Sequence, residues 1–181
     1  MFDSELKAFC DNRELVSIHS DASEYGSFTV GYIAGYNEEH YLLALISPYG
    51  RYDGFLVKER KSIVSVEHGG KYESKIKRLA AYYNTEHEKL NLSGDDLRLS
   101  MLKFASERNF IVAIELNGSG DQDCIGYVKS IDTKNDEMSC TISLIDDNGD
   151  NDGEAVFLLD DITELSVNTE DEIILKILHE S

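Results

Sequence analysis

Apolar residues in the first part of the chain follow a helical period and then a strand period. Phe2, Leu6, Phe9 and Cys10 fall on one face of a helix, which predicts a helix over residues 2–11. Beyond this segment the apolar residues form short runs separated by Gly, Asn and Asp, which is typical of β-strands. The predicted strands lie at 15–18, 28–36, 41–47, 55–58 and 63–67.

The connections between these runs are short. The polar segment 21–27 is predicted to be a turn, and 60–62 has room for only a single helical turn. Helical spacing then returns and predicts a second helix over about 71–91, introduced by Gly69-Gly70.

The second half of the chain shows the same order of patterns after a linker at 93–96. Asp95 or Asp96 is predicted to be the N-cap of the next helix. The predicted elements are a helix at 96–107, strands at 110–116, 124–131, 138–145, 154–159 and 162–167, and a shortened helix from Glu170.

A turn motif marks the same place in both halves. Gly50-Arg51-Tyr52-Asp53-Gly54 and Gly149-Asp150-Asn151-Asp152-Gly153 lie 99 residues apart, and each separates two apolar runs. Upstream of the turn the matching residues lie 95 apart, as with Leu6 and Met101. A four-residue insertion within 129–140 accounts for the difference, so the pattern predicts an internal duplication.

A helix, five short bent strands and a one-turn helix before the last strand describe a small closed β-barrel. The predicted fold class is α+β, mainly β, with two tandem five-stranded barrels, each preceded and followed by a helix. Residues 1–94 form the first repeat and residues 95–181 the second, which is acidic and has the shorter final helix.

Two stretches resemble the motifs of the Sm-like family, within the broader SH3-like barrels. Residues 31–37 through 42–45 are similar to the first Sm motif, with a glycine in the second strand, an aromatic residue, a turn and an apolar third strand. Residues 56–64 resemble the second motif. The resemblance covers about 15–67 and, more faintly, 110–167, and it implies the barrel fold.

The chain departs from the positions that the family's RNA-binding members use. Those members place an Asp and an Asn around the turn between strands two and three, where they hold a uracil base. Asn37 and Tyr41 occupy these positions here, and Lys61-Ser62 replaces the Arg-Gly that precedes strand five. Asp132 matches the Asp in the second repeat, but nothing convincing follows at the position of the Asn. The resemblance therefore does not carry base recognition over to this chain.

Charge and cysteine content narrow the function classes. The chain has 17 Lys and Arg against 35 Asp and Glu, a net charge of −18, and an anionic surface repels phosphate backbones. Residues 96–181 account for −14 of this charge. The three cysteines lack the spacing of metal ligands, which favours reduced thiols in a cytoplasm. The sequence also shows no apolar span and no signal-like N-terminus, so we expect a cytoplasmic protein that does not enter membranes.

The acidic turn at residues 146–154 carries five carboxylates, and Ca²⁺ prefers such oxygen ligands. An EF-hand loop that starts at Asn148 would need Glu at its twelfth position, where Leu159 stands. A solvated acidic hairpin is favoured, and Ca²⁺ binding stays open as the alternative. No metal or cofactor is predicted.

The first half holds the basic and aromatic residues. Residues 51–78 contain eight Lys and Arg, and nine of the ten tyrosines lie between Tyr25 and Tyr83. Exposed Tyr and Arg are common interface anchors. The candidate interaction surface is Tyr49, Arg51, Tyr52, Lys58, Arg60 and Lys61.

No catalytic motif accompanies this surface. The five histidines have no paired spacing, and no GxSxG, P-loop or GxGxxG is present. We expect a non-catalytic binding or scaffold protein that contacts another protein or forms homo-oligomers. The alternative is single-stranded RNA binding by the first repeat, and a small-molecule or metal-dependent activity is the third option.

Overall fold

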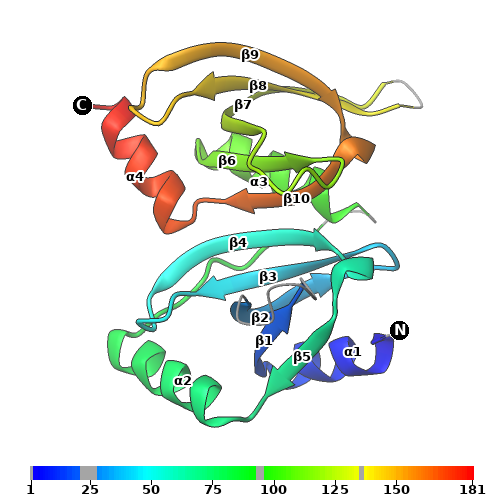
Figure 1. Ribbon diagram of the computed structural model, residues 1–181, viewed down its shortest axis with the longest axis vertical. Helices are drawn as coiled ribbons and strands as arrows, with labels where there is room; N and C mark the ends of the chain where they lie inside the picture. Colours follow the sequence, from blue (N-terminus) through cyan, green and yellow to red (C-terminus); the bar gives the residue numbers. More distant parts are fainter. Residues whose placement is uncertain (1, 21–27, 93–95, 135–136) are drawn as a thin grey trace. The chain divides into compact units, whose positions relative to one another are not determined.

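The computed structural model describes residues 2–20, 28–92, 96–134 and 137–181. The chain divides into two compact units, Met1–Leu90 and Asn91–Ser181. The predicted turn at 21–27 and the N-cap candidate Asp95 lie outside the described residues. Figure 1 shows the elements of each unit.

Both units have the same order of elements, a helix, four strands, a one-turn 3₁₀-helix, a fifth strand and a final helix. Unit 1 consists of α1 (Asp3–Asn12), β1 (Leu15–His19), β2 (Thr29–Tyr36), β3 (His40–Ile46), β4 (Tyr52–Glu59), η1 (Arg60–Ser62), β5 (Ser65–His68) and α2 (Lys71–Tyr83). Unit 2 consists of α3 (Leu97–Arg108), β6 (Ile111–Leu116), β7 (Cys124–Asp132), β8 (Ser139–Ile145), β9 (Asn151–Leu158), η2 (Leu159–Asp161), β10 (Ile162–Val167) and α4 (Glu170–His179).

The prediction of two closed barrels is wrong, because the strands of each unit form an open antiparallel sheet. The order in unit 1 is β5-β1-β2-β3-β4, and the order in unit 2 is β10-β6-β7-β8-β9. A barrel would require the first and last strands of each order to pair with each other. In unit 1, β5 has only four residues, pairs with β1, and is exposed at its last two positions.

Helices cover the sheet of unit 1 with two separate apolar clusters. On α1, Leu6 is fully buried and packs with Val16, Ile18 and Leu43. On α2, Ile76 and Ala80 pack with residues of β1, β2 and β3 in the second cluster. The two clusters fix both helices onto the sheet through burial of apolar surface.

The second predicted helix ends earlier than residue 91. Asn84 adopts the left-handed conformation (φ 51°, ψ 45°) and its N–H bonds the carbonyls of Ala80 and Ala81, which is a common helix C-cap. Thr85 then donates a hydrogen bond from Oγ1 to the carbonyl of Gly50 at 2.6 Å. Residues 85–90 therefore lie outside the helix and belong to no helix or strand, and we call them the strap.

The structure corrects the register of the repeat by one residue before β2. Val16 pairs with Gly31 in unit 1, and Val112 pairs with Gly126 in unit 2. Val16 therefore corresponds to Val112, so matching residues of the first helix and first strand lie 96 apart. Leu6 corresponds to Leu102 rather than to Met101. Irregularities recur between matching residues of the ladders, at Ile33/Gly35 and at Val128/Ser130.

Candidate functional site

The outward face of α2 carries a continuous row of exposed side chains, which we call the α2 stripe: Lys71, Lys75, Arg78 and Tyr82. Their spacing of three to four residues places them on one side of the helix, opposite Ile76 and Ala80, which are buried. Three cations precede one aromatic ring along this face, and Tyr82 is 78% exposed. The stripe belongs to a rigid helix whose opposite face lies in the core.

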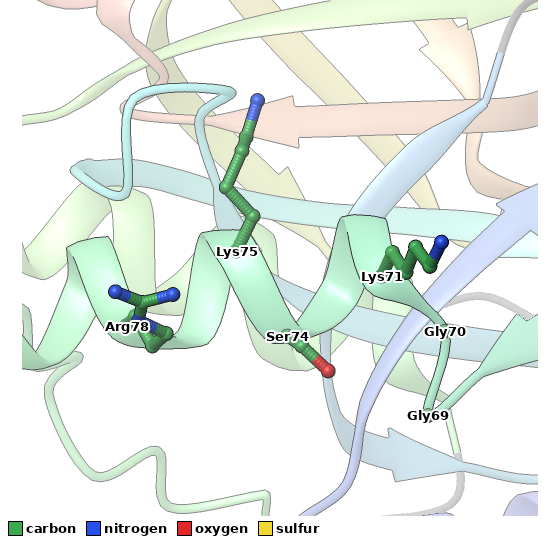
Figure 2. Close-up of a pocket in the computed structure, with 6 residues that line it drawn as sticks. All are labelled: Gly69, Gly70, Lys71, Ser74, Lys75 and Arg78. Atoms are coloured by element: carbon green, nitrogen blue, oxygen red, sulfur yellow. The ribbon is translucent and has the colours of Figure 1, made fainter.

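The first turns of α2 border a shallow depression of about 320 Å³, lined by Gly69, Gly70, Lys71, Ser74, Lys75 and Arg78. Figure 2 shows that the Lys71, Lys75 and Arg78 side chains leave the helix in different directions, so they do not converge on one point. The backbone N–H of Gly70 donates a hydrogen bond to the Glu73 carboxylate at 3.0 Å, so it is not available to a bound anion. This geometry suits several acidic side chains spread along a partner better than one bound phosphate.

The turn between β3 and β4 places further exposed Arg and Tyr side chains beside the C-terminal end of the α2 stripe. The Arg51 guanidinium lies 4.7 Å from the centroid of the Tyr83 ring, in a cation–π contact. Tyr82 and Tyr83 contact each other edge to face at 5.1 Å. Tyr49 in the same turn is 72% exposed. Arg and Tyr of this kind commonly anchor protein interfaces.

The structure divides the predicted interaction surface into two groups. Tyr49 and Arg51 lie at the first end of β4, whereas Lys58 and Lys61 lie at or beyond its far end, about seven residues and roughly 20 Å away along the strand. Tyr52 is half-buried and stacks on His87 at 4.8 Å. The structure therefore does not bring the six predicted residues together on one surface.

Arg60 is a structural residue. Its guanidinium is largely buried, pairs with Asp3 at 2.8 Å, and donates to the carbonyl of Asn37 at 2.6 Å. Lys61 pairs with Glu59 beside it. Sequence reasoning did not select the α2 residues Tyr82 and Tyr83 for this surface, because the predicted helix ran past them to about residue 91.

The final helix of unit 2 carries different side chains at the matching positions. The α4 stripe is Glu170, Ile174 and Ile177, which correspond to Lys71, Lys75 and Arg78. Ile174 is 50% exposed and Ile177 is 61% exposed, and Leu178 beside them is also exposed. The same helix face is therefore basic and aromatic in unit 1 and acidic and apolar in unit 2.

The acidic turn of unit 2 is held by its own backbone. The Asp146 carboxylate accepts hydrogen bonds from the N–H groups of Asn148 and Asp150, both at 2.9 Å. The bond from Asp150 is the main reason that the pKa of Asp146 is lowered. Among the residues that the structure describes, no group of three His, Cys, Asp or Glu side chains could hold a metal ion.

The cysteine thiols do not have the character of nucleophiles. Burial raises the pKa of Cys140 to about 12, and it also raises the pKa values of Cys10 and Cys124, so these thiols stay protonated near neutral pH. None of the helices in the described ranges is long and apolar enough to cross a membrane.

Comparison with protein-family models, with curated proteins and with solved structures gives no match to this chain. No enzyme family is therefore indicated by similarity, and the chemistry of the two helix faces is the best guide to function.

Proposed function

We propose that this chain is a non-catalytic binding protein that associates with its own copies, with the α2 stripe of one copy bound to the α4 stripe of another. The observation that carries the proposal is the divergence of one helix face between two units of the same design. A face kept only for solubility has no need of exposed isoleucines in one unit and exposed tyrosine with cations in the other.

The two stripes are complementary in charge. The α2 stripe presents three cations, whereas α4 has Glu170 and Asp171 exposed in its first turn. Opposite charges across an interface raise the association rate and select the partner. The acidic character of unit 2 as a whole extends this attraction beyond the helix.

The apolar parts are complementary as well. Ile174, Ile177 and Leu178 can bury surface against the rings of Tyr82 and Tyr83, while the aliphatic stems of Lys75 and Arg78 cover the rest. Two helix faces of this size bury less area than a standard interface, so we expect a dissociation constant of about 10 to 100 μM.

A heterologous contact of this kind predicts a specific result when two variants are mixed. The α2 variant, Lys75→Glu with Arg78→Glu, keeps an intact α4 stripe, and the α4 variant, Ile174→Lys with Ile177→Lys, keeps an intact α2 stripe. Each variant alone is expected to be monomeric at concentrations where the unchanged protein forms larger species. The equimolar mixture is expected to form a 1:1 dimer and nothing larger, as measured by sedimentation velocity.

The matched control is Lys103→Glu with Arg108→Glu, which makes the same charge change at exposed positions of α3 and is expected to leave association intact. Association of the unchanged protein is expected to weaken in 0.5 M NaCl, because salt screens exposed charges. A strict monomer at several hundred micromolar, or a mixture that contains only monomers, would contradict the proposal.

A second candidate function is single-stranded RNA binding by the α2 stripe. Cations followed by exposed aromatic rings are the combination that holds a nucleic acid backbone and stacks its bases. The test is fluorescence anisotropy of a labelled uridine-rich oligonucleotide at low salt. Binding at micromolar protein that the Lys75→Glu, Arg78→Glu variant loses would favour RNA, and the absence of binding would remove this candidate.

A further inference from the structure

The strap encloses a cavity of about 630 Å³ in unit 1, between itself, the sheet and the end of α1. The strap is anchored at its start, where Thr85 bonds the Gly50 carbonyl, and again at His87. Volumes of several hundred Å³ are typical of small-molecule sites. The cavity lies wholly within the residues of unit 1 and does not include the α2 stripe.

The floor of the cavity is apolar and comes from the sheet. Ala34 of β2, Ala44 of β3 and Phe55 of β4 line it, and Leu90 adds apolar surface from the strap. Ala44 and Phe55 are cross-strand neighbours, so they lie on the same face of the sheet. Ala34 and Ala44 leave space that larger side chains at these positions would fill. This composition favours a flat apolar group over a polar one.

The strap residues differ in exposure. Thr85 and His87 are half-buried, while Glu86, Glu88 and Lys89 are exposed. Glu86, Glu88 and Lys89 also line the cavity, so their exposed charges belong to its rim, whereas His87 lies deeper.

His87 is a polar group that the protein leaves incompletely bonded. Its ring packs against Tyr52 at 4.8 Å and against Phe55 at 5.3 Å. Burial lowers its pKa, although backbone hydrogen bonds with Leu45 and Gly54 partly oppose this, so the imidazole is neutral near pH 7. Its Nε2 atom is buried and has no hydrogen-bond partner among the described groups, which costs free energy unless a ligand or water bonds to it.

Two cations line the cavity, Lys89 on the strap and Arg13 at the end of α1. Arg13 ends α1 in the left-handed conformation and is exposed. Its charge is close enough to the Tyr32 hydroxyl to oppose the effect of burial, which raises the pKa of that phenol. Guanidinium groups bind carboxylates in a planar, bidentate geometry, and the neighbouring hydroxyl can donate a further hydrogen bond.

We propose that this cavity binds a small aromatic monocarboxylate, with the ring on the floor formed by Ala44 and Phe55 and the carboxylate at Arg13 and Tyr32. This inference is independent of the contact between the α2 and α4 stripes, because it uses none of their residues.

Three matched probes test the ligand class. Isothermal titration is carried out with 2-naphthoate, with naphthalene-2-carboxamide and with 2-naphthylmethylammonium, which share the ring and differ in charge. The expected result is that 2-naphthoate binds about tenfold more tightly than the carboxamide, which corresponds to about 1.4 kcal/mol, and that the ammonium compound binds most weakly.

Two variants separate the carboxylate contact from the ring contact. Arg13→Gln is expected to reduce 2-naphthoate binding to the level of the carboxamide and to leave carboxamide binding unchanged. Ala34→Leu is expected to abolish binding of both, because the added atoms occupy the floor. Circular dichroism of each variant shows whether the fold is kept, and should Ala34→Leu unfold the chain, the Arg13→Gln result decides alone.

The control is Arg108→Gln in unit 2, which removes the same charge from the end of the corresponding helix and is expected to leave 2-naphthoate binding unchanged. Failure of 2-naphthoate to bind at millimolar concentration would overturn the proposal. Equal affinities for the acid and the amide, or an unchanged affinity in Arg13→Gln, would overturn it as well.

Discussion

Replacing Gly149 by alanine is expected to lower the free energy of unfolding by about 3 kcal/mol, roughly three times the loss expected for Gly153→Ala. Both glycines belong to the turn between β8 and β9, and both have positive φ, 86° and 83°. The left-handed conformation alone costs an alanine about 1 kcal/mol at either position. The difference between the two variants therefore measures something other than φ.

That difference is the close approach of the turn to α4. A Cβ atom on Gly149 would lie 2.7 Å from the backbone N of His179 and 2.8 Å from the Cβ of Leu178. A Cβ on Gly153 would meet no atom within 4 Å. The helix must shift to accept Gly149→Ala, and this shift also strains the 2.7 Å contact between Nδ1 of His179 and the Gly149 carbonyl.

The measurement is urea unfolding followed by far-ultraviolet circular dichroism, since the chain has no tryptophan. Unit 1 supplies an independent pair of observations, because a Cβ on Gly50 would lie 2.4 Å from the Cβ of Leu79 on α2. Gly50→Ala is expected to behave like Gly149→Ala. Equal losses for Gly149→Ala and Gly153→Ala would show that the contact with α4 contributes nothing to stability.

The turn glycines show what could be predicted from the sequence. Gly50 and Gly149 were identifiable as matching turn residues because Gly and Asp have strong local preferences. The one-turn helix at 60–62 and the N-cap Asp96 followed from local preferences too, and both are confirmed. The second helix was predicted too long, because Asn84 ends it by adopting a conformation that spacing does not reveal.

Contacts between distant elements were not predictable from local patterns. In unit 1, Arg60 of η1 pairs with Asp3 of α1, whereas in unit 2 Arg98 of α3 pairs with Asp160 of η2. The ion pair joins the same two elements with the charges exchanged. A comparison of the repeats that seeks identical residues at matching positions scores these positions as mismatches, although the interaction is kept.

The open sheet was missed for the same reason. The number and length of the strands fit a barrel, but closure depends on whether the two end strands meet, and no single stretch of sequence records that. The α2 stripe was only partly found, since its cations were noted as a basic region while Tyr82 was assigned no role. Its importance emerges only when α2 and α4 are compared position by position.

Glu172 is expected to make the free energy of unfolding of unit 2 fall by about 3 kcal/mol as pH rises from about 4.5 to about 7. Burial raises the pKa of this carboxyl from 4.5 to about 7, and the hydrogen bonds from Ser166 and Thr169 only partly oppose the effect. The folded state therefore binds more protons than the unfolded state within this window. Stability from the protonated group is complete below about pH 4.5 and is lost as pH rises through the folded-state pKa.

Glutamine at position 172 reproduces the protonated form. The Ser166 hydroxyl lies 2.5 Å from Oε1 of Glu172, and the Thr169 backbone nitrogen lies 2.5 Å from Oε2. The amide oxygen of Glu172→Gln can accept from Thr169, and its NH₂ group can donate to the Ser166 hydroxyl, which lies 3.5 Å from the carbonyl of Ala113. The variant is thus expected to equal the unchanged protein at pH 4.5 and to exceed its stability at pH 8 by about 3 kcal/mol.

Urea unfolding at intervals between pH 4.5 and pH 8 measures this, with the difference between variant and unchanged protein as the quantity of interest. Taking the difference removes the general repulsion among the many carboxylates, which also changes with pH. Glu170→Gln removes the same charge from an exposed position of α4 and controls for net charge. A difference that stays constant across the window would mean that Glu172 is already ionised in the folded state at low pH, and its two hydrogen bonds would then outweigh the cost of burying the charge.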